Sequence, residues 1–258
     1  MVTGIASALA LVVKDSEGEV PEAGKVTVGS ITEVGTSGVY TATLKGSLAG
    51  TYTVTPQYAG SNIGTLSDTV MLTVGAPDGV KSTFAAAPKS IAADDTATSI
   101  LTLTAKDASG NVVTGVASRL SLSVKDGLGA TPASDKLTVS SITESETLPG
   151  TYTATLKGKL AGIYTVKPQF NGSDIGTLSD TVTLTVGVVD GVQSSFVTAP
   201  KSIASDGVAT STLTLTAKDA NGNLITGIAS SLSMSVKDSL GGTCLLYTSP
   251  SPRDMRRS

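Results

Sequence analysis

The chain has 258 residues and a formal net charge of −3, with 40% apolar, 15% charged and 3% aromatic residues. It contains no His and no Trp, so neither a Ser-His-Asp or Cys-His nucleophilic site nor a His-bearing zinc site can be built from it. The slight negative charge argues against nucleic acid as a partner, because binding to phosphates needs a basic face. Apolar stretches such as 8–13 are far shorter than the roughly 18 to 20 residues of a membrane span, and no secretory signal is visible after Met1. We therefore expect no membrane contact in this segment.

The sequence repeats itself with an offset of 112 residues. Residues 78–126 and 190–238 are identical at 35 of 49 positions, and residues 39–55 match 151–167 at the same offset. Residues 3–15 match 114–126 at an offset of 111. A repeat of this size can hold its own core, and it is too long for a solenoid repeat of roughly 20 to 50 residues. We therefore interpret this sequence as a segment of a longer tandem array of such units.

This pattern divides the chain into four segments. Residues 1–77 are the C-terminal part of one unit, residues 78–189 a complete unit, and residues 190–243 the N-terminal part of a third. Residues 244–258 break the repeat and bring the only Cys, Cys244, with a cluster of Arg. The run from Cys244 to Asp254 resembles a translated sequencing adaptor, and we interpret this tail as an artefact. A basic tail that binds an anion is the alternative.

Within the complete unit, apolar side chains alternate with Thr and Ser, which is typical of half-buried strands. Turn clusters such as 107–111 and 171–172 separate the runs. We expect seven strands, in chain order around 82–84, 97–105, 120–125, 136–142, 151–156, 163–170 and 181–186. Seven short strands in about 110 residues predict an all-β fold of tandem Ig-like antiparallel β-sandwich domains. Half a sandwich exposes unpaired edges, so the two split units, the last with three strands, should be less ordered than 78–189.

The segment Ala161–Val166 fits the tyrosine corner of such a sandwich, with Tyr164 as the corner residue. Val166, and Val54 in the first unit, take the place that a half-cystine has in disulfide-bearing Ig domains. Apolar packing must therefore replace the disulfide. Tyr152 and Tyr164 are both predicted to point inward.

Several of these segments together resemble the bacterial Ig-like domains of the intimin/invasin adhesins, most closely the type of the third extracellular domain of invasin. The segments that carry the resemblance are 88–92 (PKSIA), 101–108 (LTLTAKDA), 110–111 with 114–115, 152–156 (YTATL) and 161–166 (AGIYTV). The resemblance covers nearly all of residues 1–243. It implies an outer-membrane anchor, a stalk of Ig-like domains and a distal cap that binds a host receptor. What it transfers to this segment is the stalk role, and it supplies no receptor-binding residue here.

Candidate ligand residues are few, and we expect no catalytic, cofactor-binding or metal site and no cofactor. Asp94, Asp95, Asp107 and Asn111 are the densest acidic loop positions. A calcium site needs about six to eight oxygen ligands, and Asp95 becomes Gly207 in the next unit. Solvated turn residues are therefore the favoured interpretation, with calcium as the alternative.

Other polar or Gly-rich motifs have structural interpretations as well. The stretch 127–130 lacks the Lys and the helix of a phosphate loop. The recurring pairs 14–15, 125–126 and 237–238 (Lys-Asp) are interpreted as strand-end pairs that face water. The dipeptides 78–79 and 190–191 (Asp-Gly) are interpreted as junctions between domains, short enough to limit swinging.

Three functions remain open, and none of them is enzymatic. The first is a spacer in a stalk at the bacterial cell surface, whose partners are the neighbouring Ig-like domains of the same chain, while a host receptor would be bound outside this segment. The second is a module that directly binds a host protein or glycan, which the poverty in aromatic residues argues against. The third is a non-catalytic module of a large secreted enzyme or a phage tail protein, which fold alone does not exclude.

Overall fold

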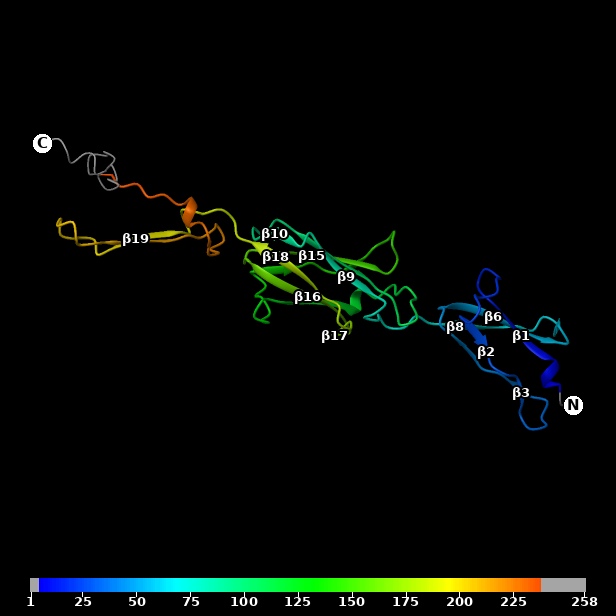
Figure 1. Ribbon diagram of the computed structural model, residues 1–258. Helices are drawn as coiled ribbons and strands as arrows, with labels where there is room; N and C mark the ends of the chain where they lie inside the picture. Colours follow the sequence, from blue (N-terminus) through cyan, green and yellow to red (C-terminus); the bar gives the residue numbers. More distant parts are fainter. Residues whose placement is uncertain (1–4, 238–258) are drawn as a thin grey trace, which may run out of the picture. The chain divides into compact units, whose positions relative to one another are not determined.

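The computed structural model describes residues 5–237, and the tail over 244–258 lies outside them. The chain splits into two compact units, one ending at Val186 and the other beginning at Gly187. The predicted boundaries at 77/78 and 189/190 stay a proposal. Residues 83–185 form two sheets that we call the central sandwich, and Figure 1 labels several of its strands.

The first sheet of the central sandwich has the strand order β10–β18–β16–β12, with β17 beside β16. Its strands are β10 (Ser90–Ala92), β12 (Leu120–Lys125), β16 (Gly162–Phe170), β17 (Ser173–Asp174) and β18 (Asp180–Thr185), and the short 3-10 helix η2 (Ala117–Arg119) precedes β12. The second sheet has the order β13–β15–β11–β9, with β14 beside β15. Its strands are β9 (Thr83–Ala87), β11 (Ser99–Thr104), β13 (Leu137–Val139), β14 (Thr143–Glu144) and β15 (Thr151–Gly158). The predicted all-β Ig-like sandwich is confirmed.

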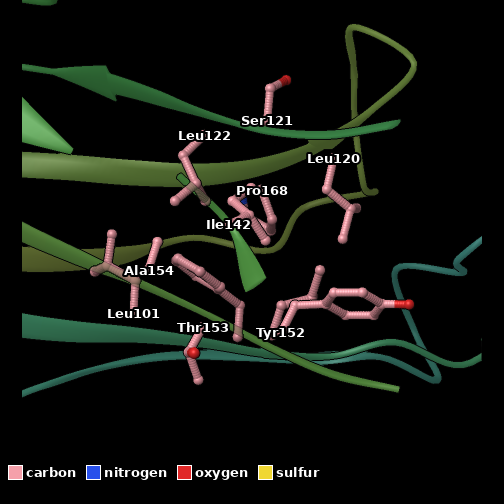
Figure 2. A pocket seen from close by; sticks show the side chains of 11 residues that line it. Leu101, Leu120, Ser121, Leu122, Ile142, Tyr152, Thr153, Ala154 and Pro168 are labelled. Carbon is pink, nitrogen blue, oxygen red and sulfur yellow. The ribbon is translucent and has the colours of Figure 1, made fainter. Parts of the chain in front are cut away.

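The core follows the alternation of the sequence. In β11, Leu101 and Leu103 are 1% and 4% exposed, whereas the side chain of the neighbouring Ile100 points to the other face and Ile100 is 49% exposed. Figure 2 shows the side chains of both sheets meeting between the layers, among them Leu101, Leu122 and Pro168. Val166 is completely buried, so apolar packing occupies the position of the missing half-cystine.

One strand pair differs from the expected antiparallel pattern. Strand β10, which the sequence analysis did not predict, pairs in parallel with β18, while β9 pairs with β11 in the other sheet. Pro88 lies between β9 and β10, and it cannot donate to a ladder, so β9 ends there and the chain crosses from the second sheet to the first. Asp180 bridges this crossing, because its carboxylate accepts the Ala86 N–H (2.9 Å) and the Lys89 ammonium (2.8 Å).

Residues 5–74 contain the counterparts of only part of this sandwich. One sheet joins β1 (Leu9–Lys14), β6 (Gly50–Tyr58), β7 (Ser61–Asn62) and β8 (Asp68–Leu72), after the 3-10 helix η1 (Ala6–Ala8). Two strand pairs accompany it, β2 (Val26–Val28) with β5 (Leu44–Gly46) and β3 (Thr32–Glu33) with β4 (Tyr40–Thr41). The long strand β15 thus corresponds here to two short strands, β4 and β5. In this segment, β5 pairs with β2 alone, whereas β15 is also held by β11.

In the second unit the described strands are β19 (Ser195–Ala199) and β20 (Thr212–Thr216), which form an antiparallel pair followed by the 3-10 helix η3 (Ala229–Ser231). The third strand that we expected near residues 232–236 does not form among the described residues. Its counterpart β12 pairs with β16, and the described residues of this unit contain no counterpart of β16. A strand without a partner leaves its backbone groups to water and gains no ladder.

Candidate functional site: the Asp107 loop

The loop after β11 is built around the carboxylate of Asp107. Its backbone N–H donates to the Asn111 carbonyl (2.9 Å), and a bridge between Lys106 and Val112 closes the base of the loop. Gly110 has a φ of +90°, which glycine adopts without strain. The expected turn chemistry is therefore present.

Asp107 is only 5% exposed, and its carboxylate accepts four hydrogen bonds. Its Oδ1 accepts the N–H groups of Ser109 (3.0 Å) and Asn111 (2.9 Å). Its Oδ2 accepts the Asn111 side-chain amide (2.9 Å) and the backbone N–H of Gly75 (3.0 Å), which comes from 32 residues earlier in the chain. Burial works against the charged form, but the hydrogen bonds from Asn111, Gly75 and Ser109 outweigh it, and the pKa of Asp107 lies below its usual value.

Asn111 extends this contact to the turn between β5 and β6. Its side-chain oxygen accepts the Ala49 N–H (3.0 Å), and its amide nitrogen donates to the Ser47 carbonyl (3.0 Å). A cavity of about 270 Å³ lies beside these bonds, lined by residues 46–49, 72–73, 75–76, 107–109 and 111. The loop thus holds both the linker at Gly75 and the turn before β6.

The same arrangement recurs in the second unit. Asp219 is 2% exposed, and its Oδ2 accepts the N–H of Gly187 (3.0 Å), again 32 residues earlier, and the Asn223 side-chain amide (2.8 Å). Its Oδ1 accepts the N–H groups of Asn221 (3.0 Å) and Asn223 (2.9 Å). Burial again opposes ionisation, and these hydrogen bonds, with that from Gly187 the strongest, keep the pKa of Asp219 below its usual value.

A carboxylate that accepts four N–H donors is suited to holding backbone in place rather than to proton transfer. The calcium alternative required Asp94, Asp95, Asp107 and Asn111 to act together. Asp94 instead precedes β11 and Asp107 follows it, so the two residues lie in loops at opposite ends of the strand and cannot share one cation. Within residues 5–237, no group of three or more acidic, Cys or His side chains is placed to hold a metal ion.

The other candidate positions are turn and strand-end residues. Asp94 accepts the N–H groups of Thr96 and Ala97 (both 2.8 Å), and these bonds, that from Ala97 first, lower its pKa. Asp95 has a φ of 63°, which explains why Gly207 stands there in the next unit. Its carboxylate lies 3.8 Å from the Lys157 ammonium and 3.6 Å from that of Lys159.

In the two Lys-Asp pairs whose members are both described, the Lys and the Asp form no ion pair with each other, and both Asp side chains bond to other groups. Asp126 accepts the N–H groups of Leu128 and Ala130 (both 2.9 Å), so it caps the Gly-rich turn 127–130, and Asp15 caps the turn after β1 in the same way. Lys125 instead donates to the Thr131 hydroxyl (2.7 Å). Of the third pair, Asp238 lies outside the described residues.

The Asp-Gly dipeptides form turns next to the same loops. Asp78 accepts the N–H groups of Val80 and Lys81 (both 2.9 Å), and its own N–H donates to the Lys106 carbonyl (2.7 Å). Asp190 makes the same bonds, with its N–H donating to the Lys218 carbonyl (2.8 Å). The backbone at each Asp-Gly dipeptide is therefore bonded to the residue just before the buried Asp.

Both predicted inward tyrosines are 1% exposed. Tyr164 donates to the Leu160 carbonyl (2.8 Å), and Tyr52 makes the same bond to Leu48 (3.0 Å), so the tyrosine corner is present in both parts. Tyr152 donates to the Val113 carbonyl (2.9 Å), and burial raises its pKa. These side chains fasten loops to the core.

Sequence reasoning placed Asp107 in a turn but missed its bond to Gly75. A Gly stands 32 residues before the Asp in both repeats, at 75 and 107 and at 187 and 219. This constant separation does not indicate a contact, because every pair of residues in a tandem repeat recurs at a constant separation.

Two Ig-like sheets joined by apolar packing, with loops that hold the adjoining linker, define a tandem Ig-like domain protein. The family described as invasin, domain 3, matches the chain over residues 78–187 and again over 190–248. The chain belongs to this family, and it is an adhesin domain of the invasin/intimin type. No helix among residues 5–237 has the length and apolar character needed to cross a membrane.

Named relatives agree with this assignment. The chain is similar to the inverse autotransporter adhesin YeeJ of Escherichia coli (strain K12), with 29% identity over 209 residues, which is 81% of this chain and 8% of that protein. Among solved structures it is similar to FdeC, an Escherichia coli adhesin, with 31% identity and a TM-score of 0.54 over 88% of this chain and 66% of that chain. It is also similar to invasin, a bacterial integrin-binding protein, with 25% identity and a TM-score of 0.52 over 85% of this chain and 48% of that chain. The chain thus spans less than two thirds of each of these proteins.

Proposed function

We propose that this chain is a spacer segment in the extracellular stalk of a bacterial surface adhesin and has no enzymatic activity. The stalk connects an outer-membrane anchor to a distal receptor-binding tip, both outside this segment. The partners of the segment are the neighbouring Ig-like domains of its own chain.

The observation that carries this proposal is the repeated anchoring of a glycine by a buried aspartate, Gly75 by Asp107 and Gly187 by Asp219. A short linker whose N–H is bonded to the following sandwich has fewer conformations than a free one. Restricted linkers turn separate sandwiches into a semi-rigid spacer. Each sandwich then adds roughly 30 to 40 Å, given about 3.3 Å per residue along its strands plus the loops.

The surface chemistry supports the same role. In the central sandwich, Thr and Ser occupy most of the outward positions of the strands, which limits the apolar surface available to bind other proteins. The largest aromatic side chains of the central sandwich, Tyr152 and Tyr164, are buried in the core and are not available as contact residues.

The experiment that tests the spacer role measures length and binding separately. Chains carrying one or two additional copies of residues 78–189 are labelled at both ends, and the end-to-end distance should rise by roughly 30 to 40 Å per copy. The same chains are incubated with host cells and should show no specific binding. A distance that grows only as the square root of the number of copies, or specific binding by this segment alone, would contradict the proposal.

A further inference from the structure

The hairpin between β16 and β17 carries the dipeptide Asn171–Gly172 at its tip. Both residues have a positive φ, +50° and +80°, which are the angles of a type I′ turn. Their counterparts in the first part of the chain are Ala59 and Gly60, with φ of +47° and +83°. The same turn thus forms there without an amide side chain, so the amide at position 171 is not required for the turn.

Arg119 contacts Asn171 through both its backbone and its side chain. The Arg119 carbonyl accepts the Asn171 backbone N–H at 2.9 Å, and the guanidinium Nε donates to the Asn171 side-chain oxygen at 3.1 Å. The guanidinium also lies over the ring of Phe170, with its carbon 4.3 Å from the ring centroid. Since a guanidinium has donors only, the atom that faces it is the amide oxygen of Asn171, and the amide nitrogen is left outside this bond.

This contact polarises the side-chain carbonyl of Asn171. A cation that donates to a carbonyl oxygen draws electrons from the carbonyl carbon and stabilises negative charge that develops on the oxygen. Among residues 5–237, no carboxylate lies within ion-pair distance of Arg119. Its counterparts in the other units are Ala8 and Ser231, so this cation is specific to the central sandwich.

The backbone nitrogen that follows the amide is accessible. Apart from its chain neighbours, no atom lies within 4 Å of the place where a Cβ of Gly172 would stand. None of the described residues accepts the N–H of Gly172. In the other Asn-Gly dipeptide of the chain, the Gly222 N–H donates to the Asp219 carbonyl at 2.9 Å. In the described part of the chain, an unbonded Gly nitrogen next to a polarised Asn carbonyl therefore occurs only at Asn171–Gly172.

We propose that Asn171 is a self-modification site, at which Arg119 promotes hydrolysis of the side-chain amide. The Gly172 nitrogen loses its proton to hydroxide and attacks the side-chain carbon of Asn171, and the new C–N bond closes a succinimide ring. The negative charge of the tetrahedral intermediate develops on the oxygen that Arg119 holds. The amide nitrogen takes a proton from water and leaves as ammonia. Water then opens the ring to aspartate or isoaspartate, so the sum of the steps converts the amide and one water to an acid and ammonia.

The two products differ in their effect on the hairpin. Aspartate tolerates a positive φ and places a carboxylate against the guanidinium of Arg119. Isoaspartate adds a methylene group to the main chain, which a two-residue type I′ turn does not accommodate. Because ammonia is lost, the change is one-way, and the converted fraction rises with the age of the molecule.

The first test follows this reaction in the full chain at neutral pH by peptide mass mapping. Asn171 lies in the tryptic peptide 160–201, whose mass should rise by the exchange of an amide for an acid. In water labelled with heavy oxygen, the new acid should carry the label. Removal of one donor from a buried oxyanion site costs about 100- to 1000-fold in rate, and the exposed position of Arg119 reduces the loss expected for Arg119→Ala to about tenfold.

Lys125→Ala is the matched control, because it removes a nearby cation that donates to the Thr131 hydroxyl instead, and it should react like the unchanged chain. Loosening of the hairpin alone would speed ring closure, because a flexible Asn-Gly reaches the required geometry more readily. A slower reaction in Arg119→Ala is therefore not explained by a structural loss. An equal or faster reaction in Arg119→Ala overturns the proposal. So does an unchanged chain that fails to react under conditions in which the isolated peptide 160–201 reacts.

The second test transfers the site to the first part of the chain. There, the Ala59 N–H donates to the Ala8 carbonyl at 2.9 Å, as in the pair of Asn171 and Arg119, and Tyr58 takes the place of Phe170. Ala59→Asn creates the dipeptide without the cation, and Ala8→Arg adds the cation. The chain with both substitutions should react at position 59 about tenfold faster than the chain with Ala59→Asn alone. Equal rates at this position in the two chains overturn the role of the guanidinium.

Discussion

At the scale of single residues, the carboxylate of Asp107 determines how the chain between the first part and the central sandwich is held. It collects the N–H of Gly75 together with three donors from its own loop. Removing the carboxylate by Asp107→Ala leaves these donors without an acceptor in a buried position, which typically costs about 1–3 kcal/mol per group. We expect a lower free energy of unfolding for the central sandwich and faster amide exchange at Gly75. Asp94→Ala is the matched control, because this exposed Asp caps only its own turn. Equal protection of Gly75 in both variants would contradict this role.

Acidification should release the same contact. The pKa of Asp107 is lower in the folded chain than its ordinary value of 3.8. A lowered pKa means that the carboxylate contributes stability above the ordinary value and loses it as the pH falls through the folded pKa. We therefore expect the amide protection factors of Gly75 and Gly187 to stay constant from about pH 7 down to about pH 5, and to fall only below about pH 4. The amide exchange of both glycines, measured by NMR against pH, checks this, and a transition near neutrality would contradict it.

The tyrosine corner makes a second prediction for a single side chain. Tyr164→Phe keeps the buried ring and removes the hydrogen bond to the Leu160 carbonyl. The expected loss is about 1 kcal/mol of unfolding free energy, measured by urea denaturation. Tyr58→Phe is a suitable control, because Tyr58 is 46% exposed and should change stability little.

At the scale of elements, adjacent positions of β11 should differ sharply. Leu101→Ala opens a cavity in the core and should cost about 2–5 kcal/mol. Ile100→Ala shortens a half-exposed side chain of the same strand. Apart from the lower β-propensity of Ala, its loss of unfolding free energy should stay within about 0.5 kcal/mol. Chemical denaturation of both variants measures this, and similar losses would mean that the strand does not alternate between core and solvent.

The strands were predictable because period-two alternation and turn residues are local signals. The runs around 97–105, 120–125 and 163–170 formed as β11, β12 and β16 within a few residues. Strand β10 was missed, because three residues behind a proline give no periodic signal and their pairing with β18 is nonlocal. The prediction of a strand near 232–236 was wrong for the opposite reason. Its local pattern alternates as a strand does, but its partner strand is absent from the described part of the unit.

The candidate site was only half predictable. The acceptor Asp107 and its turn follow from the Asp, Gly and Asn at 107–111, since these residue types favour local capping. The donor Gly75 lies 32 residues away, and nothing local to either residue indicates the bond. A buried carboxylate is identified by the donors that converge on it in space, which a single sequence does not list.

At the scale of the whole molecule, stability should be unevenly distributed. The central sandwich has two complete sheets, whereas residues 5–74 and β19–β20 expose the counterparts of its core residues. Amide exchange should be slowest in β11, β15 and β16 and about tenfold faster in β6 and β20. Equal protection of all three segments would contradict the division into one complete and two incomplete units.

The claim that the domains act as spacers depends on restricted linkers, and one distance measurement tests it most directly. Spin labels at Val20→Cys and Leu128→Cys, both exposed positions, are placed in a Cys244→Ser background. Double electron–electron resonance should give a single narrow distance distribution, which broadens when Asp107→Ala is added. A distribution that is already broad with Asp107 in place, or one that Asp107→Ala leaves unchanged, would contradict the claim.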